Sequence, residues 1–276
     1  MAWHTENVGD LKTSYLLNGP AETMTSEKAE LTLANSVAFG KMLLIDGELQ
    51  STERDEYIYH EMLVHPLASI NGPVRVKIYG GGEGATAREV LRWPCVKKVV
   101  QVDWDAQLLE HFRTKWTGWS KGSFDDPRLE LRVEDAFMDA DKEKYDYIII
   151  DLPDPDNIDD FRVLLRSVAL QLSENGSFVM NAGPVQPWDG GFAEKLCEVI
   201  HEEFPSYEYY SWHTNVPSFA AAGEWCFLGA KTIREPVYPL TPLRPFRRFS
   251  ELVWKYASYW PDDYPEELIR FSSLIN

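Results

Sequence analysis

The stretch VRVKIYGGGEGATAREVLRW, residues 74–93, carries the pattern most informative about the architecture of this chain. Its first seven residues form an apolar run that predicts a buried strand, and the residues after the glycines predict a loop that enters a helix. The turn between them is Gly80-Gly81-Gly82-Glu83-Gly84. Glycines at such a turn let the backbone bend sharply and approach a ligand closely. The stretch therefore predicts the first strand, turn and helix of a ligand-binding α/β sheet.

The same alternation of strand and helix continues toward the C-terminus. We expect strands at 97–104, 129–135, 144–151 and 176–183, helices at 105–116, 161–172 and 192–204, and a closing strand pair at 206–212 and 224–230. Repeated βαβ units predict a mostly parallel, doubly wound sheet. Ligands of such a sheet bind at the carboxyl ends of its strands.

The first 70 residues have a different pattern. Short runs at 29–34 and 39–50 predict strands, with Asp46-Gly47 as a hairpin turn. Apolar residues at helical spacing predict a helix over 55–69. We therefore expect a small β-stranded N-terminal domain with a connecting helix over 1–70 and an α/β domain over 71–276. The tail from Arg234, rich in proline and aromatic residues, is interpreted as a packed C-terminal cap.

Composition narrows the possible partners. The formal net charge is -17 over 276 residues, which argues against nucleic acid, because phosphates need a basic surface. The same charge permits a small cationic ligand, which an acidic cleft would attract, although a negative surface also keeps a protein soluble. No stretch approaches the ~20 apolar residues that span a bilayer, and the first residues lack the basic region of a signal peptide. We expect a cytoplasmic protein that binds no membrane.

Acidic residues follow successive predicted strands. Asp103 comes roughly twenty residues after the glycines, where an acid accepts hydrogen bonds from ribose hydroxyls. Asp135, with Ala136 beside it, follows the third strand and is placed to reach the base of the same nucleoside. Glu83 would repel a pyrophosphate but attract an ammonium or sulfonium group. Together these residues predict a cofactor of the S-adenosylmethionine type, although each acid alone could be a solvated residue at a strand end.

Two further motifs carry polar groups toward the same edge. Asp151 and Asp154, in the segment DLPDP, could hold a cationic amine, and one of them could accept its proton. An alkylammonium of pKa ~10.4 makes that proton an obstacle of ~4 to 5 kcal/mol at neutral pH. Tyr59 and His60 are polar residues on an otherwise amphipathic helix. The alternative for Asp151 and Asp154 is an Asp-Pro turn that caps the next helix. The alternative for Tyr59 and His60 is that they are ordinary hydrogen-bonded polar groups of the core.

Taken together, these motifs resemble the spermidine synthase, or polyamine aminopropyltransferase, family from about Leu31 through Gly229. The resemblance rests on FGKMLLIDGELQSTERDEYIYHEMLVHP, GGGEGATAREVL, DLPDP, NAGP and VPSF. The glutamate in GGGEG and the NAGP and VPSF segments are most similar to the thermospermine synthase branch. The resemblance implies a Rossmann-like domain of the methyltransferase type behind a small β-stranded domain, no metal, and a homo-oligomer, either a dimer or a tetramer.

The resemblance also implies an activity. An aminopropyl group would pass from decarboxylated S-adenosylmethionine, as co-substrate, to a polyamine, with release of 5'-methylthioadenosine. The conversion would be spermidine to thermospermine or spermine, or putrescine to spermidine. Two alternatives stay open: an S-adenosylmethionine-dependent methyltransferase on the same fold, and a catalytically silent polyamine-binding protein.

By the same resemblance, residues receive roles. Asp151 would be the general base, Tyr59, Asp154 and Phe219 would contact the amine, and the donor would be bound by Gln50, His60, Gly80, Gly81, Glu83, Asp103, Asp135 and Ala136. Two positions depart from the family pattern. Ala29 stands where members usually have glutamine, which puts one donor contact in question, and Phe219 stands where many members have tyrosine.

Overall fold

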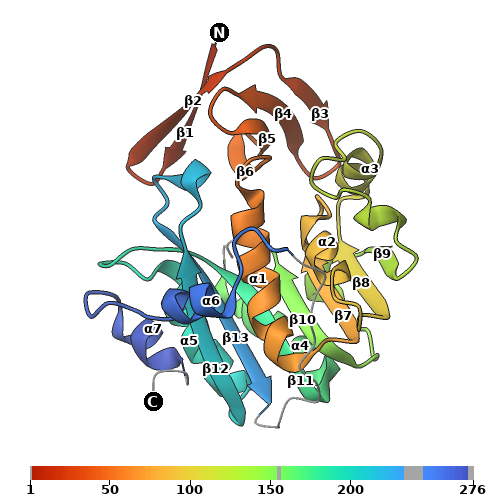
Figure 1. The fold of residues 1–276 in the computed structure, drawn as a ribbon, viewed down its shortest axis with the longest axis vertical. Coiled ribbons are helices and arrows are strands. Elements are labelled where there is room, and N and C mark those ends of the chain that lie inside the picture. Colours follow the sequence, from red (N-terminus) through yellow and green to blue (C-terminus); the bar gives the residue numbers. More distant parts are fainter. Residues whose placement is uncertain (1, 154–156, 233–244, 273–276) are drawn as a thin grey trace.

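The computed structural model describes residues 2–153, 157–232 and 245–272. An N-terminal sheet lies above a larger sheet, and helix α1 (Glu56–Asn71) leads from the first to the second (Figure 1). This arrangement confirms the predicted fold class, a doubly wound α/β sheet preceded by a small β-stranded part.

The N-terminal sheet has six strands in the described chain, and every pairing in it is antiparallel. The order is β1-β2-β4-β5-β6, with β3 paired to β4, and the strands are β1 (Ala2–Val8), β2 (Leu11–Leu17), β3 (Glu22–Thr25), β4 (Glu30–Ser36), β5 (Gly40–Ile45) and β6 (Glu48–Thr52). Asp46 and Gly47 join β5 to β6 with φ values of 51° and 84°, as tight hairpin turns require. The predicted hairpin is confirmed.

The larger sheet has the order β12-β13-β11-β10-β7-β8-β9. Its strands are β7 (Arg75–Gly80), β8 (Lys98–Asp103), β9 (Leu129–Val133), β10 (Tyr145–Asp151), β11 (Leu172–Val185), β12 (Tyr207–Thr214) and β13 (Glu224–Thr232). The five strands from β11 to β9 are parallel, and β13 and β12 continue the sheet antiparallel. The predicted strand pattern and the closing pair are confirmed.

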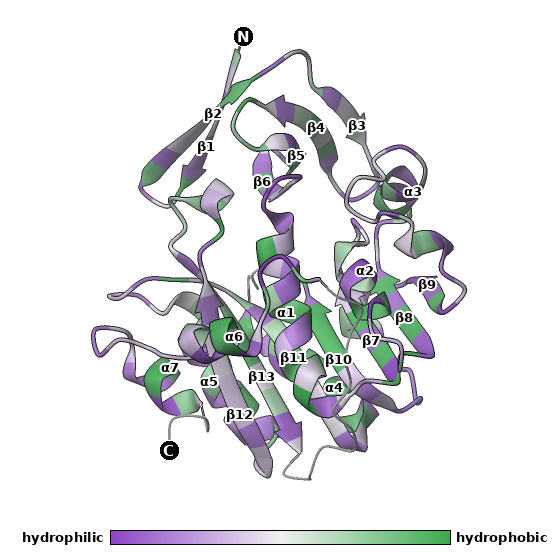
Figure 2. Ribbon diagram, in the orientation of Figure 1, coloured by the Kyte–Doolittle hydropathy of each residue, from purple (hydrophilic) through white to green (hydrophobic). Residues whose placement is uncertain are grey.

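Helices cover both faces of this sheet (Figure 1). One face packs against α1, α2 (Ala85–Leu91) and α6 (Glu251–Ala257), and the other packs against α4 (Ile158–Gln171), α5 (Gly191–Glu203) and α7 (Glu266–Phe271). Strand β10 lies between the two layers and is buried over most of its length, with three consecutive isoleucines as its hydrophobic stretch (Figure 2). Helix α3 (Ala106–Thr114) instead packs with residues of the N-terminal sheet.

Helix α1 belongs to the core of the larger sheet. Met62, Leu63 and Leu67 are fully buried in the same cluster as residues of β7 and β10. Gly72 ends the helix in the left-handed region and donates its N–H to the carbonyl of Ala68. The division into domains 1–70 and 71–276 stays a prediction.

Of the tail predicted as a C-terminal cap, residues 245–272 pack on the sheet, and residues 234–244 lie outside the described part of the chain. Buried Glu61 of α1 accepts the backbone N–H groups of Arg247, Arg248 and Phe249 at 3.0, 2.6 and 2.9 Å. In the part of the chain that the structure describes, we find no helix long and apolar enough to cross a bilayer. The homo-oligomeric state and the cytoplasmic location stay predictions.

Candidate active site

The carboxyl ends of three neighbouring parallel strands meet at one edge of the larger sheet. Gly80, the last residue of β7, pairs with Asp151, the last residue of β10. On the other side of β7, strand β8 ends at Asp103, which pairs with Val133 of β9. The chain runs outward in both directions from β7, so this edge is the switch point where doubly wound sheets bind ligands.

The glycine turn passes between the two strand-end carboxylates. A Cβ atom on Gly81 would lie 3.1 Å from Oδ2 of Asp151, and one on Gly82 would lie 2.9 Å from Oδ2 of Asp103. A Cβ on Gly82 would also lie 2.1 Å from Cδ2 of Leu108, and one on Gly80, at φ 82°, would lie 2.1 Å from the carbonyl oxygen of Asp151. Side chains at these positions would collide with the strand ends or with Leu108, so the sequence needs glycine here.

A buried amide holds the turn from within the sheet. Nε2 of Gln101, in β8, donates to the carbonyl oxygens of Gly80 and Gly81 at 3.0 and 2.7 Å. These carbonyls lie beside the ligand edge, where the turn leaves the sheet. Gln101 therefore fixes the backbone that separates the two acids.

Asp151 is held by two hydroxyl groups. Tyr59 of α1 donates to Oδ1 at 2.7 Å, and Thr86 of α2 donates to Oδ2. Burial raises the pKa of Asp151 and the negative charge of Glu83 adds to this, while His60 and the two hydroxyls oppose it. A carboxylate with a raised pKa is a stronger base than an exposed one, which suits proton transfer.

Asp103 has a more crowded electrostatic environment. Its Oδ1 accepts the backbone N–H of Asp105 at 2.9 Å. Burial raises the pKa of Asp103 to about 6, and the charges of Asp105, Glu83 and Asp151 contribute to the increase. Several acids thus face one another across the glycine turn, and a bound cation would relieve their repulsion.

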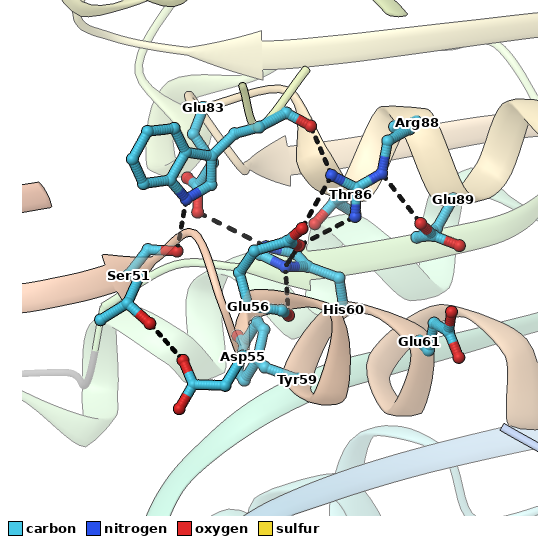
Figure 3. A network of polar contacts seen from close by, with 12 residues as sticks. Ser51, Asp55, Glu56, Tyr59, His60, Glu61, Glu83, Thr86, Arg88 and Glu89 are labelled. Carbon is cyan, nitrogen blue, oxygen red and sulfur yellow. Dashed lines mark hydrogen bonds and ion pairs between the residues drawn. The ribbon is translucent and has the colours of Figure 1, made fainter. Parts of the chain in front are cut away.

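His60 connects Glu83 to the interior of the protein (Figure 3). Its Nδ1 lies 3.0 Å from Oε2 of Glu56, and its Nε2 lies 3.4 Å from Oε1 of Glu83. Arg88 of α2 reaches Glu56 through two nitrogens, at 3.1 and 2.8 Å. Burial alone would lower the pKa of His60, but the two glutamates outweigh it and raise this pKa to about 10.

Aromatic side chains line the side of the site near Tyr59. The ring of Tyr59 lies 5.8 Å from Trp225 and 5.4 Å from Phe227, measured between ring centroids. Phe219, in the short helix η3 (Pro217–Phe219), packs edge-on against Trp225 at 5.2 Å. Phe219 is thus connected to Tyr59 through Trp225, and Tyr59 in turn contacts Asp151.

Other residues with predicted roles lie farther out. Gln50 is exposed on β6, and Asp135 is exposed and accepts the backbone N–H of Phe137, so that it caps the short helix η2 (Ala136–Met138). Ala136 is buried in the core beneath α4. Ala29 precedes β4, and its carbonyl accepts the N–H of Ser26. Asp154 lies outside the described residues.

The sequence patterns assigned no role to six residues of the site: Glu56, Thr86, Arg88, Gln101, Trp225 and Phe227. The spacing of Glu56 and His60, four residues apart on one helix, was a signal that they could interact. The partners of Thr86 and Gln101 depend on strand order and had no local signal. Within residues 2–153, 157–232 and 245–272, no group of three or more His, Cys, Asp or Glu side chains is arranged to hold a metal ion.

Comparison with known proteins agrees with this geometry. A family model described as "Spermine/spermidine synthase domain" matches residues 56–233. Thermospermine synthase ACAULIS5 of Arabidopsis thaliana is 37% identical over 238 residues, which cover 81% of this chain and 68% of that protein. A polyamine aminopropyltransferase of Sulfolobus acidocaldarius is 37% identical over 260 residues, which cover 91% and 83%.

The fold comparison extends over nearly the whole chain. A crystal structure of spermidine synthase with the transition-state analogue AdoDATO superimposes with a TM-score of 0.86 at 25% identity, covering 97% of this chain and 94% of that one. The chain belongs to the spermine/spermidine synthase family. Its activity is that of a polyamine aminopropyltransferase, as the sequence motifs predict.

Proposed function

We propose that this aminopropyltransferase uses decarboxylated S-adenosylmethionine as donor and a polyamine at least as long as spermidine as acceptor, with thermospermine or spermine as product. The observation that carries the proposal is the buried carboxylate of Asp151 beside the glycine turn, held by Tyr59 and Thr86. Similarity to a thermospermine synthase supports the choice of acceptor.

The donor site is assigned to the acids around the turn. Asp103 would accept the ribose hydroxyls, and Glu83 would face the positively charged end of the donor. Decarboxylated S-adenosylmethionine ends in an ammonium, which Glu83 attracts, whereas S-adenosylmethionine carries a carboxylate at that end, which Glu83 repels. Gly80, Gly81 and Gln50 would complete the donor contacts, with Asp135 and Ala136 at the adenine end.

The reaction needs an amine with a free lone pair. The acceptor nitrogen attacks the aminopropyl carbon next to the sulfonium, and a C–N bond forms as the C–S bond breaks. The sulfur keeps the bonding electrons and leaves as 5'-methylthioadenosine, and the nitrogen loses a proton to Asp151. Because an alkylammonium has a pKa of ~10.4, a positioned base offsets an obstacle of ~4 to 5 kcal/mol at neutral pH.

The acceptor would lie along the aromatic side of the site. Tyr59 and Phe219 would contact its methylene groups, and Trp225 holds these two rings in place. Asp154 is proposed as a second acid for a distant amino group, because a carboxylate attracts a polyamine nitrogen.

The test is a product analysis. Putrescine, agmatine and spermidine are each offered with decarboxylated S-adenosylmethionine and, separately, with S-adenosylmethionine. We expect thermospermine or spermine from spermidine with the decarboxylated donor alone. Turnover confined to putrescine or agmatine contradicts the acceptor assignment. A methylated product indicates a methyltransferase, and binding without turnover indicates a silent polyamine-binding protein.

A further inference from the structure

Both ring nitrogens of His60 face oxygen atoms that can only accept a hydrogen bond. Nδ1 lies 2.7 Å from the backbone carbonyl oxygen of Glu56 and 3.0 Å from its carboxylate, and Nε2 faces the carboxylate of Glu83. A neutral imidazole has a single N–H, so one of its nitrogens would direct a lone pair at oxygen lone pairs. Two protons resolve this conflict, and His60, which is 2% exposed, is then an imidazolium.

Glu56 cannot supply the missing proton, because cations surround it. Arg88 donates to both of its carboxylate oxygens, and Nζ of Lys121 lies 3.6 Å away. Burial alone would raise the pKa of Glu56, but His60 and Arg88 outweigh it and lower this pKa to about 2. The charges therefore alternate along the row Arg88, Glu56, His60 and Glu83, from helix α2 to the ligand edge (Figure 3).

A second buried histidine of α1 shows the contrast. Nε2 of His65 lies 2.9 Å from Glu89, but its Nδ1 receives the indole N–H of Trp93 at 3.2 Å. A nitrogen that accepts a hydrogen bond has no proton, so His65 is the neutral tautomer with hydrogen on Nε2. Burial lowers the pKa of His65 accordingly. Two histidines five residues apart, each beside a glutamate, thus differ in charge because of one neighbour.

We propose that Glu56 and Arg88 are positioning residues that hold His60 as an imidazolium, and that this cation fixes Glu83 in the donor site and keeps Asp151 ionised. The inference rests on the proposed function of Glu83 and Asp151. The groups that face His60 are Glu56 from its own helix, Glu83 from the glycine turn, Asp151 from β10 and the ring of Tyr59 at 5.1 Å. Its positive charge opposes the effect of burial on Asp151.

Nitrogen NMR of the ligand-free protein tests the charge directly. Histidine labelled with ¹⁵N is observed between pH 6 and 8.5, and the His60→Gln and His65→Gln variants identify the two residues by their missing signals. We expect two protonated ring nitrogens for His60 and one for His65 across this range. In the Glu56→Gln variant, we expect His60 to lose a proton within the range. A neutral His60 in the unmodified protein at pH 7 overturns the proposal, whether or not the enzyme turns over any polyamine.

Kinetics test the positioning role. For Glu56→Gln, we expect the donor KM to rise about tenfold between pH 7 and 9. The reason is that His60 becomes neutral over this range, so that Glu83 loses one partly buried charge contact. Glu61→Gln is the matched control, because it also removes a buried carboxylate of α1, but one that contacts Arg92 and the backbone of 247–249 instead of Arg88 or His60. Its donor KM should follow the pH dependence of the unmodified enzyme. Arg88→Lys should keep that dependence, and Arg88→Met should resemble Glu56→Gln. If the donor KM rises by the same factor at every pH in both glutamate variants, the role of Glu56 is merely structural and the proposal is overturned.

Discussion

The carboxylate of Asp55 accepts two hydrogen bonds from Ser218, one from the backbone N–H at 2.7 Å and one from the hydroxyl at 3.1 Å, although 163 residues separate them in sequence. Asp55 precedes helix α1, which carries Tyr59, and Ser218 lies in η3 beside Phe219. Both side chains are buried, at 5% and 1% exposure. The pair therefore fixes the loop on the proposed acceptor side to helix α1, whose Tyr59 donates a hydrogen bond to Asp151.

Ser218→Ala should weaken the acceptor and spare the donor. The variant loses one hydroxyl bond to Asp55 but keeps the backbone bond, and one hydrogen bond contributes about 0.5–1.5 kcal/mol. We expect the acceptor KM to rise about two- to tenfold while the donor Kd is unchanged, measured by steady-state kinetics and calorimetry. Ser211→Ala is the control, because it also removes a buried hydroxyl with distant partners, Leu268 and Trp260. Equal weakening of donor and acceptor would contradict this assignment.

Donor binding should depend on the ionisation of Asp103. With its pKa raised to about 6, this carboxyl is ionised at pH 8 and mostly protonated at pH 5. If the donor binds the ionised form, its affinity falls as pH decreases through 6, by about tenfold at pH 5. Calorimetric titrations with decarboxylated S-adenosylmethionine from pH 5 to 8 measure this. Asp103→Asn should bind more weakly and lack the transition, and an unchanged transition in that variant assigns it to another group.

Glu83 should set the preference for the decarboxylated donor. The unmodified enzyme should bind decarboxylated S-adenosylmethionine more tightly than S-adenosylmethionine, because the carboxylate of the latter is repelled. Glu83→Gln removes that charge and should reduce the preference by on the order of tenfold, a modest Coulomb effect for a partly solvated site. Competition titrations of the unmodified enzyme and of Glu83→Gln measure the ratio of the two donor affinities in each protein. Equal affinity for the two compounds in the unmodified enzyme would refute the role of Glu83.

The features that depend on short stretches of chain were predictable from the sequence. The βαβ alternation, the Asp46-Gly47 hairpin and the glycine turn each follow from neighbouring residues, so the fold class was predictable. The meeting of Asp103 and Asp151 was also predictable, since acids at the ends of parallel strands share one edge.

The partners of those acids were not predictable, because they depend on packing between distant segments. Tyr59 and Asp151 are 92 positions apart, and Thr86 and Asp151 are 65 apart. Asp55 illustrates the same limit. An aspartate before a helix ordinarily accepts an N–H of the first turn, but Asp55 makes no such capping bond and binds Ser218 and Thr52 instead. Tertiary contacts overrode the local preference there.

The role of Asp151 is tested by Asp151→Asn, which keeps the shape of the side chain and removes its basicity. We expect kcat to fall by on the order of 10² to 10⁴, the usual contribution of a general base. The donor Kd should change little, because Glu83 and Asp103 are untouched. The acid limb of the kcat profile, measured at saturating donor, should also disappear: a base with a raised pKa loses activity as pH decreases through that pKa, and asparagine does not titrate.

Two further variants, at Thr86 and Asp154, separate proton transfer from other contacts in the proposed active site. Thr86→Val removes one hydrogen bond to Asp151 but leaves the base, so kcat should fall by about tenfold or less. Asp154→Asn should chiefly raise the acceptor KM, since a charge contact rather than proton transfer is lost. Steady-state kinetics of the three variants across pH, together with donor titrations, make the comparison. If Asp151→Asn kept nearly the full kcat, or if Thr86→Val lost as much as Asp151→Asn, Asp151 would not be the base, and the proton would have to leave the acceptor amine by another route.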